Sequence, residues 1–381
     1  MILTQAAEII AHLEHNDISL AVRRMLDLSL ESGNRELMKE SITWSRNLHN
    51  QPAEDKVDAA FLQQGYALVE KAKQLKTVAG PAITELVQAD NISKRYQSGN
   101  FSLKPVSMKI SNGQITGVVG ENGNGKTTLL RCLAGQLAID NGQINYSLLK
   151  NPDYYDVKNY VAFIPQRIPK WYGLLKDNLH FSASIAGVKG EENELIVDFM
   201  LERLGLAKYA MLTWSQISSG YRTRFELARI LLQKPQLLIL DEPLANLDIK
   251  AQQTVLTDLK FLARSSYNPL GIILSSQQLH EVEKVADDVI FIKDGQAIYH
   301  STSRPEQHFS GYSLEIETKE SREYIQQVLA GKDASISFNG GFYTIVSQHT
   351  KVSEMISTII SSGMQVTYFR DITYSAKRYF N

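Results

Sequence analysis

The stretch GENGNGKTT, residues 120–128, decides how this chain folds. It follows the apolar run ITGVV (115–119), which predicts a buried strand, and it precedes LLRCLAGQL (129–137), whose apolar spacing predicts a helix. Glycines let backbone N–H groups turn inward around an anion, and a helix N-terminus adds its partial positive charge. A Gly-x-x-x-x-Gly-Lys-Thr loop between a strand and a helix therefore predicts a phosphate-binding loop in an α/β fold.

A second motif, QLLILDEP at 236–243, lies further along the chain. Its apolar run predicts a buried parallel strand, and its two acids follow at the carboxyl end, where open α/β sheets bind ligands. Lys126 is expected to reach the β- and γ-phosphates, and Thr127 and Asp241 are expected to hold Mg²⁺. Glu242 is expected to polarise the attacking water as general base. ATP and Mg²⁺ are thus the predicted cofactors, and ATP hydrolysis is the predicted reaction.

Residues 217–229, ISSGYRTRFELAR, resemble part of the nucleotide-binding subunit of the ATP-binding cassette (ABC) family. ISSGY corresponds to the signature LSGGQ, with Ser218 and Gly220 retained and with substitutions at Ser219 and Tyr221. The resemblance covers about residues 85–300. It implies that Ser218 and the backbone around Gly220 approach a γ-phosphate held by the opposite subunit of a dimer.

Other landmarks of the resemblance fall in order along the chain. Tyr96, in KRYQSGNF, matches the aromatic that stacks on adenine, although a half-buried strand tyrosine is the plain alternative. Gln166, in AFIPQR, matches the glutamine that senses Mg²⁺ and the γ-phosphate, and Asp248 closes LANLD (244–248), which matches the D-loop at the partner subunit. The residues that the resemblance places on nucleotide are Tyr96, Gly120, Asn122, Gly123, Asn124, Gly125, Lys126, Thr127, Thr128, Ser218, Gly220 and Asp248. Its metal ligands are Thr127, Gln166 and Asp241.

The stretch SSQQLHEVE, 275–283, departs from the family, which has a histidine where this chain has Gln277. Glutamine carries an amide N–H donor, so it can keep one hydrogen bond to the γ-phosphate, but it cannot become cationic. Losing one such transition-state contact costs on the order of 3 kcal/mol, roughly a hundredfold in rate, and a partly replaced contact should cost less. With Glu242, Gln166 and Gln277 as the catalytic set, we expect slow but real hydrolysis. His280 is expected to face elsewhere.

The chain divides into segments by its apolar pattern. Residues 1–76 have helical spacing and predict a small all-α domain of four helices, either a packing bundle or a docking site for a partner. Within it, Asp17 is the expected N-cap of the second helix and Pro52 the expected start of the fourth. Residues 77–84 predict a linker, 85–300 the ABC ATPase domain, and 311–381 a small α+β domain with ferredoxin-like alternation.

Composition narrows the classes of function. The net charge of −1 over 381 residues, with no long basic tract, disfavours a nucleic-acid partner. Cys132 is the one cysteine, so no intramolecular disulfide forms, and its apolar surroundings favour an inert core residue. Neither a secretory signal nor a run of eighteen apolar residues is present. We therefore expect a cytoplasmic protein held at the cell membrane by other chains.

The favoured interpretation is the ATPase subunit of an ABC exporter. Its expected partners are separate membrane-spanning permease subunits and a second ATPase subunit, in a homodimer or a heterodimer. Export is suggested by YFRDITYSAKRYF (368–380), which resembles the tails of bacterial ATPase subunits that serve export-type permeases. Trp171 and Tyr172 are candidate contacts with the membrane subunits. The alternatives are a soluble ABC ATPase that acts on another protein and an ATP-gated switch with little turnover.

Overall fold

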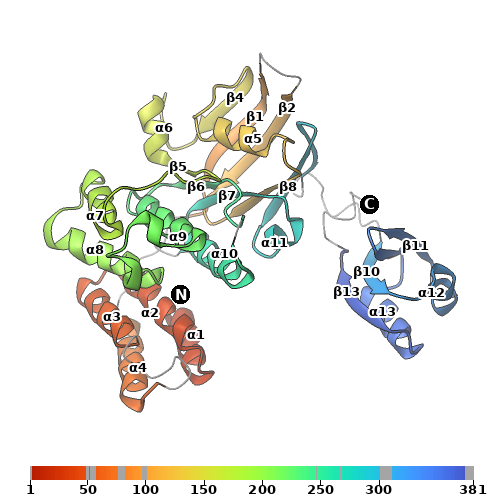
Figure 1. Cartoon of the computed structure of the whole chain (residues 1–381), viewed down its shortest axis with the longest axis horizontal. Helices are drawn as coiled ribbons and strands as arrows, with labels where there is room; N and C mark the ends of the chain where they lie inside the picture. The colour runs from red at the N-terminus through yellow and green to blue at the C-terminus, as the bar shows by residue number, and fades with distance from the viewer. Residues whose placement is uncertain are drawn as a thin grey trace.

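The computed structural model of the chain describes residues 2–48, 51, 57–75, 82–96, 101–245, 247–265, 268–300 and 311–373. The predicted α/β region is present, with a helical bundle before it and a small antiparallel sheet after it (Figure 1). Within the described ranges, no helix is long and apolar enough to cross a membrane.

The central sheet has six strands in the order β5-β6-β7-β3-β8-β9. All neighbours pair in parallel except β8 and β9, which form an antiparallel hairpin. The strands are β3 Ile115–Val119, β5 Val161–Ile164, β6 Leu237–Leu240, β7 Gly271–Ser276, β8 Asp288–Lys293 and β9 Gln296–His300. Every residue of β3, β6 and β7 is buried, as their continuous apolar runs predict for parallel strands covered on both faces.

Two further layers complete the α/β region. A three-stranded antiparallel sheet, β2-β1-β4, consists of β1 Glu85–Arg95, β2 Ser102–Ser111 and β4 Asn141–Tyr146. The helices are α5 Lys126–Leu133, α6 Tyr154–Tyr160, α7 Leu175–Ile185, α8 Gly190–Arg203, α9 Ser219–Leu231, α10 Ile249–Ala263 and α11 Leu279–Glu283. Short 3-10 turns lie at Ala207–Tyr209 and Trp214–Gln216. Cys132, on α5, is buried, as expected for a core residue, and burial raises the pKa of its thiol to about 11.

The small C-terminal sheet has the predicted ferredoxin-like topology. Its elements are β10 Tyr312–Thr318, α12 Arg322–Val328, β11 Ala334–Asn339, β12 Phe342–Ser347, α13 Val352–Ser361 and β13 Val366–Asp371. The strand order β11-β12-β10-β13 is antiparallel throughout, and both helices pack into one apolar cluster with the sheet. Arg370, on β13, forms an ion pair of 2.7 Å with Glu283, on α11. Residues 374–381 of the tail lie outside the described residues.

The N-terminal segment forms four helices: α1 Ile2–Glu14, α2 Ile18–Glu31, α3 Arg35–Leu48 and α4 Ala59–Lys73. Asp17 does occupy the N-cap position of α2, although its side chain makes no capping hydrogen bond. The fourth helix begins later than expected. Asp58 caps α4 by accepting a hydrogen bond from Phe61 N at 2.6 Å, so Val57 precedes the helix, and the expected start, Pro52, lies outside the described residues.

The bundle packs on the helical part of the α/β region, against α8 and α10 (Figure 1). Arg46 donates to Asp198 at 2.7 Å and to Glu202 at 3.2 Å, and the buried Glu202 also accepts from Ser45 Oγ at 2.8 Å. Buried side chains of the bundle and of α8 and α10 belong to one apolar cluster. The domain boundaries at 76 and 85 stay a prediction, since residues 76–81 lie outside the described residues.

The centre of the bundle gives a stability prediction. The Trp44 ring stacks on Phe61 with centroids 5.0 Å apart, and its Nε1 donates to Phe61 O at 2.9 Å. A Cβ at Gly65 would lie 2.5 Å from this fixed ring. Gly65→Ala should therefore destabilise the protein by about 1–3 kcal/mol, the range for overpacking. At an uncrowded helix position the same change stabilises the protein by about 1 kcal/mol. The sign of the change in unfolding free energy therefore distinguishes a crowded position from an open one.

Thermal or urea unfolding measures the effect, with Gln64→Ala at the exposed neighbouring position as the control that should leave stability unchanged. A stabilised Gly65→Ala variant would contradict the packing described around Trp44.

Candidate nucleotide-binding site

The carboxyl edge of the parallel sheet gathers the predicted motifs. Strand β3 is paired with β7 (Val119 with Ser276), β7 with β6 (Leu274 with Leu240), and β6 with β5 (Leu240 with Ile164). The phosphate loop, Asp241 and Glu242, Gln277, and Gln166 each follow one of these four strands. Parallel pairing therefore brings four loops that are far apart in the sequence to one edge, as an α/β ligand site requires.

The phosphate loop is closed around the Lys126 side chain. Lys126 Nζ donates to Gly120 O at 2.7 Å and to Glu121 O at 3.2 Å. A Cβ at Gly120 would lie 2.2 Å from Ile292 O, and Gly125 has a φ of 105° with the Phe101 ring only 2.6 Å from a Cβ position. Both glycines are therefore required by the geometry of the loop, and the loop leads directly into the N-terminus of α5.

The two asparagines of the loop differ in their surroundings. Asn124 Oδ1 accepts a hydrogen bond from Asp294 N at 3.1 Å, and Asn124 O accepts one from Gly295 N at 3.1 Å. These bonds tie the loop to the turn between β8 and β9. Asn122 is exposed at the tip of the loop. The structure thus gives Asn124 a supporting role, while contact of either side chain with nucleotide stays a prediction.

Lys126 also faces the expected general base. Its Nζ lies 2.9 Å from Glu242 Oε1, and both side chains are buried. Glu242 has a φ of 51°, in the left-handed region that is uncommon for a residue with a side chain. This backbone conformation sets the direction in which the Glu242 side chain leaves the chain, toward Lys126. The pair compensates both charges, and a phosphate held by Lys126 would compete with Glu242 for it.

The Asp241 carboxylate is held through both of its oxygens. Thr127 Oγ1 donates to Asp241 Oδ2 at 2.7 Å, and Ser275 Oγ donates to Asp241 Oδ1 at 2.7 Å. Ser275 Oγ in turn accepts from Glu242 N at 2.8 Å. One buried carboxylate therefore joins α5, β6 and β7.

This donor set fits Mg²⁺. The hydroxyl of Thr127 and the carboxylate of Asp241 are hard oxygen ligands already within bonding distance of each other. Mg²⁺ at phosphate sites commonly takes one or two protein oxygens together with phosphate oxygens and water. The described residues contain no group of three or more His, Cys, Asp or Glu side chains that would hold a metal by themselves. The site thus suits a cation that is completed by a nucleotide.

Tyr96 lies beside the phosphate loop. Its hydroxyl is 3.2 Å from Thr128 Oγ1, and its ring tilts toward Phe101 at a centroid distance of 6.3 Å. The side chain is half-buried at the end of β1, so the ring stands where α5 begins. Stacking on adenine stays a prediction that this position permits.

The two glutamines and the neighbouring histidine are exposed. Gln166 follows β5, Gln277 follows β7, and His280 lies on the short helix α11. The backbone two residues before Gln166 is held by the residue that follows β6, because Asp241 N donates a hydrogen bond to Ile164 O at 2.9 Å. Both glutamines thus follow strands at the carboxyl edge, and their contact with a nucleotide stays a prediction.

The signature and the D-loop have mainly local contacts. Ser218 is the N-cap residue of α9, and its side chain makes no capping bond. A Cβ at Gly220 would meet Leu247 and Ala251 only at ordinary contact distances of 3.5 and 3.6 Å, so packing within the described chain does not demand a glycine there. Asp248 caps α10 by accepting from Ala251 N at 2.9 Å.

Comparisons with known proteins agree with this geometry. Residues 103–245 match the model of the ABC transporter family. The chain is 29% identical over 228 residues to the phosphonates import ATP-binding protein PhnC of Treponema denticola, covering 56% of this chain and 88% of the relative. It is 27% identical over 300 residues to the uncharacterized ABC transporter ATP-binding protein YxlF of Bacillus subtilis, covering 76% of this chain and 96% of the relative.

A solved structure shares the fold. The structure of cbiO1 from Clostridium perfringens, described as part of the ABC transporter complex cbiONQ, has 24% identity and a TM-score of 0.51 and covers 65% of this chain and 95% of its own. Residues 103–245 are therefore an ATP-binding ATPase domain of the ABC transporter family, with a phosphate-binding loop of the P-loop NTPase type.

Ser275 is a site residue that the sequence analysis did not assign. Ser275→Ala removes the hydroxyl that orients Asp241 and holds the Glu242 backbone. Each net hydrogen bond is worth about 1 kcal/mol, roughly fivefold in rate, so the loss of these two should lower the hydrolysis rate roughly five- to thirtyfold. Binding of ATP, measured by fluorescence of a nucleotide analogue, should change much less.

Ser182→Ala, at a buried serine on α7 away from the site, is the matched control and should keep the parent rate. An unchanged rate in Ser275→Ala would show that Asp241 is held well enough by Thr127 alone.

Proposed function

We propose that this chain, whose ATP-binding domain is of the ABC transporter family, is a slow ATPase subunit that drives separate membrane subunits by closing with a second ATPase subunit around ATP. The observation that carries the proposal is the set Lys126, Glu242, Asp241, Thr127 and Ser275, joined by contacts of 2.7 to 2.9 Å at the carboxyl edge of the sheet. It supplies a phosphate-binding cation, a general base and oxygen ligands in one place.

The residues act in order on a bound nucleotide. Lys126 exchanges Glu242 for the β- and γ-phosphates, which frees the Glu242 carboxylate. Glu242, aimed by its left-handed backbone, then accepts a proton from the attacking water. Thr127 and Asp241, with Gln166, would hold Mg²⁺, which neutralises phosphate charge when bound. Gln277 donates one amide N–H toward the γ-phosphate and cannot add a positive charge, so turnover is slow.

A second subunit would supply the contacts to the phosphates that this chain's own signature residues do not make. The Ser218 side chain and the uncrowded position at Gly220 offer a surface that approaches a phosphate, yet no hydrogen bond joins either to the phosphate loop within the described part of this chain. One solved relative of the fold is described as a dimeric, post-hydrolysis state of the cassette MJ0796 bound to ADP and Pi, at 21% identity and a TM-score of 0.51. In the proposed dimer, each Ser218 would face the partner's phosphate loop, and Asp248 would lie at the interface.

The membrane subunits are proposed to contact the exposed surface after Gln166. Tyr172 is 82% exposed and suits that contact. Trp171 does not, because it is buried against Trp214 at a centroid distance of 4.9 Å and donates to Glu226 at 3.1 Å. Of the two candidates, only Tyr172 remains in the proposal. The chain would then lie on the cytoplasmic side of the membrane through these partners.

Export is the proposed direction of transport. It rests on the resemblance of the C-terminal segment, of which residues 368–373 are described and form part of β13 and the turn after it. Several relatives are named as import proteins, among them the tungstate uptake protein TupC of Peptoclostridium acidaminophilum at 29% identity. Transport into or out of vesicles, once the membrane subunits are found, decides between the two directions.

Steady-state ATP hydrolysis by the purified chain tests the catalytic assignment. Glu242→Gln should abolish turnover and keep ATP binding, because the amide cannot accept the proton. Gln277→His should raise the rate by up to roughly a hundredfold, because it restores a donor that can carry positive charge.

His280→Gln is the matched control, since His280 is exposed and is expected to face away from the phosphates. It should leave the rate unchanged. A rate that Glu242→Gln does not lower would contradict the assignment of the base.

The second candidate function is an ATP-gated switch or the weak half of a heterodimer, and Gln277 is the feature that favours it. The hydrolysis assay distinguishes this function from that of a slow ATPase. A parent chain that binds ATP and dimerises but stays silent, and that Gln277→His activates, would be such a switch.

A further inference from the structure

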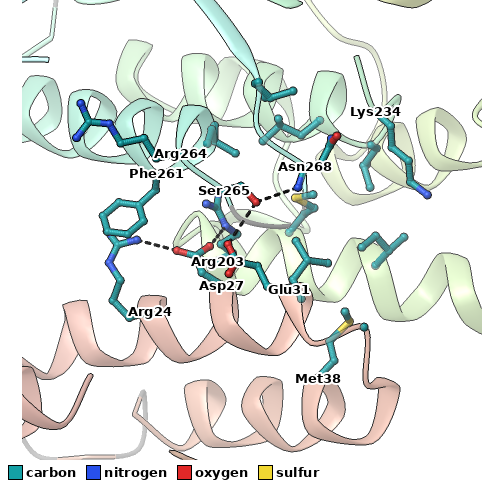
Figure 2. A pocket seen from close by; sticks show the side chains of 18 of the residues that line it. Arg24, Asp27, Glu31, Met38, Arg203, Lys234, Phe261, Arg264, Ser265 and Asn268 are labelled. Atoms are coloured by element: carbon teal, nitrogen blue, oxygen red, sulfur yellow. Dashed lines mark hydrogen bonds and ion pairs between the residues drawn. The ribbon is translucent and has the colours of Figure 1, made fainter. Parts of the chain in front are cut away.

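Helix α2 of the N-terminal bundle contacts two helices of the α/β region, α8 and α10. Asp27, on α2, forms an ion pair with Arg203, the last residue of α8, and Phe261 of α10 lies beside them (Figure 2). One turn earlier on α2, Arg23 donates a hydrogen bond to Asp258, on α10, at 3.3 Å. Helix α2 therefore links α8 to α10 through charged side chains.

Two atoms of opposite charge in this contact have no hydrogen-bond partner among the described residues. Arg203 donates to Asp27 through Nε, and its Nη1 is unpaired. Asp258 accepts from Arg23 through Oδ1, and its Oδ2 is unpaired. Arg203 and Asp258 are each 5% exposed, so water does not replace the missing partners. A buried donor and a buried acceptor that are both unpaired destabilise the arrangement that contains them.

The two unpaired atoms suit each other. Arg203 and Asp258 lie close enough to interact electrostatically, although no hydrogen bond joins the two atoms in the described structure. Burial raises the pKa of the Asp258 carboxyl, so the contact with Arg23 does not fully compensate the buried charge. A hydrogen bond from Arg203 Nη1 to Asp258 Oδ2 would satisfy both atoms, while Arg203 Nε keeps Asp27.

The two arginines differ in their access to water. The Arg23 side chain is 22% exposed, whereas that of Arg203 is 6% exposed. If Asp258 changed partners, Arg23 would return to water, and Arg203 would gain the acceptor that it lacks. The exchange leaves no buried charge alone, which is the costly outcome when a buried ion pair is broken.

A cavity of about 1000 Å³ borders this contact and leaves room for a helix to shift. Its walls come from the bundle on one side and from α8 and the C-terminal ends of α9 and α10 on the other, and Arg203 and Phe261 line it. Gln236 and Leu270, which immediately precede β6 and β7, also line it, so it lies at the amino edge of the sheet. Close-packed interiors resist displacement, but a helix beside a cavity loses fewer contacts when it moves.

We propose that the contact between the bundle and α10 has two arrangements, in which Asp258 pairs with Arg23 or with Arg203, and that the pair with Arg23 restrains closure around ATP. The inference rests on the dimer closure of the proposed function. Helices α8 and α9 both pack against α7, so a shift of α10 against α8 also changes the spacing between the starts of α9 and α10. These starts are Ser218 and Asp248, the residues proposed to meet the partner subunit.

The distance between spin labels on α8 and α10 tests the exchange. Glu191→Cys and Gln253→Cys place the labels at exposed positions, and the native Cys132 is buried. Labelled Glu242→Gln chain is diluted with unlabelled chain, so that ATP stays intact and only distances within one chain are measured. ATP should shift the label distance by on the order of 2 Å, as for helix shifts at interfaces. Arg23→Gln should populate this second distance without ATP.

Dimerisation in the same Glu242→Gln background gives a second measurement. Arg23→Gln should strengthen ATP-dependent dimerisation by roughly fivefold, the upper end for a partly exposed ion pair. In an Asp258→Asn background, Arg23→Gln should have no such effect, because the carboxylate that changes partners is gone. A general loosening of the bundle would act in both backgrounds.

Arg35→Gln is the matched control. Arg35 pairs with Glu192 across the same interface at 2.9 Å, but their side chains are 70% and 56% exposed, so the pair contributes little. The variant should keep the parent's label distance and dimerisation.

An Arg23→Gln variant that keeps the parent's label distance, with an unfolding curve that shows it folded, overturns the proposal. A shift that Arg35→Gln reproduces overturns it as well. A second distance that Arg23→Gln populates but ATP does not would support the exchange and contradict the proposed closure, so failure of the inference and failure of the proposed function are distinguishable.

Discussion

The buried carboxylate of Asp241 is the constraint on which the site depends. One oxygen accepts from Thr127 on α5 and the other from Ser275 on β7, and the Asp241 backbone is bonded to β5 through Ile164. A charge at 4% exposure is stable only with such partners. Fixing Asp241 therefore fixes the phosphate loop against two strands, and it sets the position from which Glu242 emerges.

The ion pair of Lys126 and Glu242 follows from that arrangement. Both groups are buried, so each charge must be compensated, and each is the other's partner at 2.9 Å. The same two residues are the phosphate ligand and the base of the proposed reaction. In the proposed reaction, one exchange of partners would couple nucleotide binding to activation of the base, independently of what Gln277 contributes afterwards.

The N-terminal bundle is integrated with the ATPase domain. Its buried side chains join the apolar cluster of α8 and α10, and the ion pairs of Arg46 and Arg203 cross the interface. Removing residues 1–76 would expose part of a shared core, so point variants report on its role more clearly than a deletion does. The cavity between the two parts lies at the amino edge of the sheet, where the far ends of α9 and α10 meet the bundle.

The sequence by itself determined the phosphate loop, the buried strand before Asp241 and the ferredoxin-like order of the C-terminal sheet, because glycine spacing, apolar period and strand alternation are local properties. It did not determine the role of Ser275, the start of α4 at Ala59, or the burial of Trp171. These depend on which strands and helices become neighbours, and parallel pairing joins residues that are far apart in the chain. Only the tertiary structure brought Arg24 beside Arg203 and Phe261, because three separate helices contribute them.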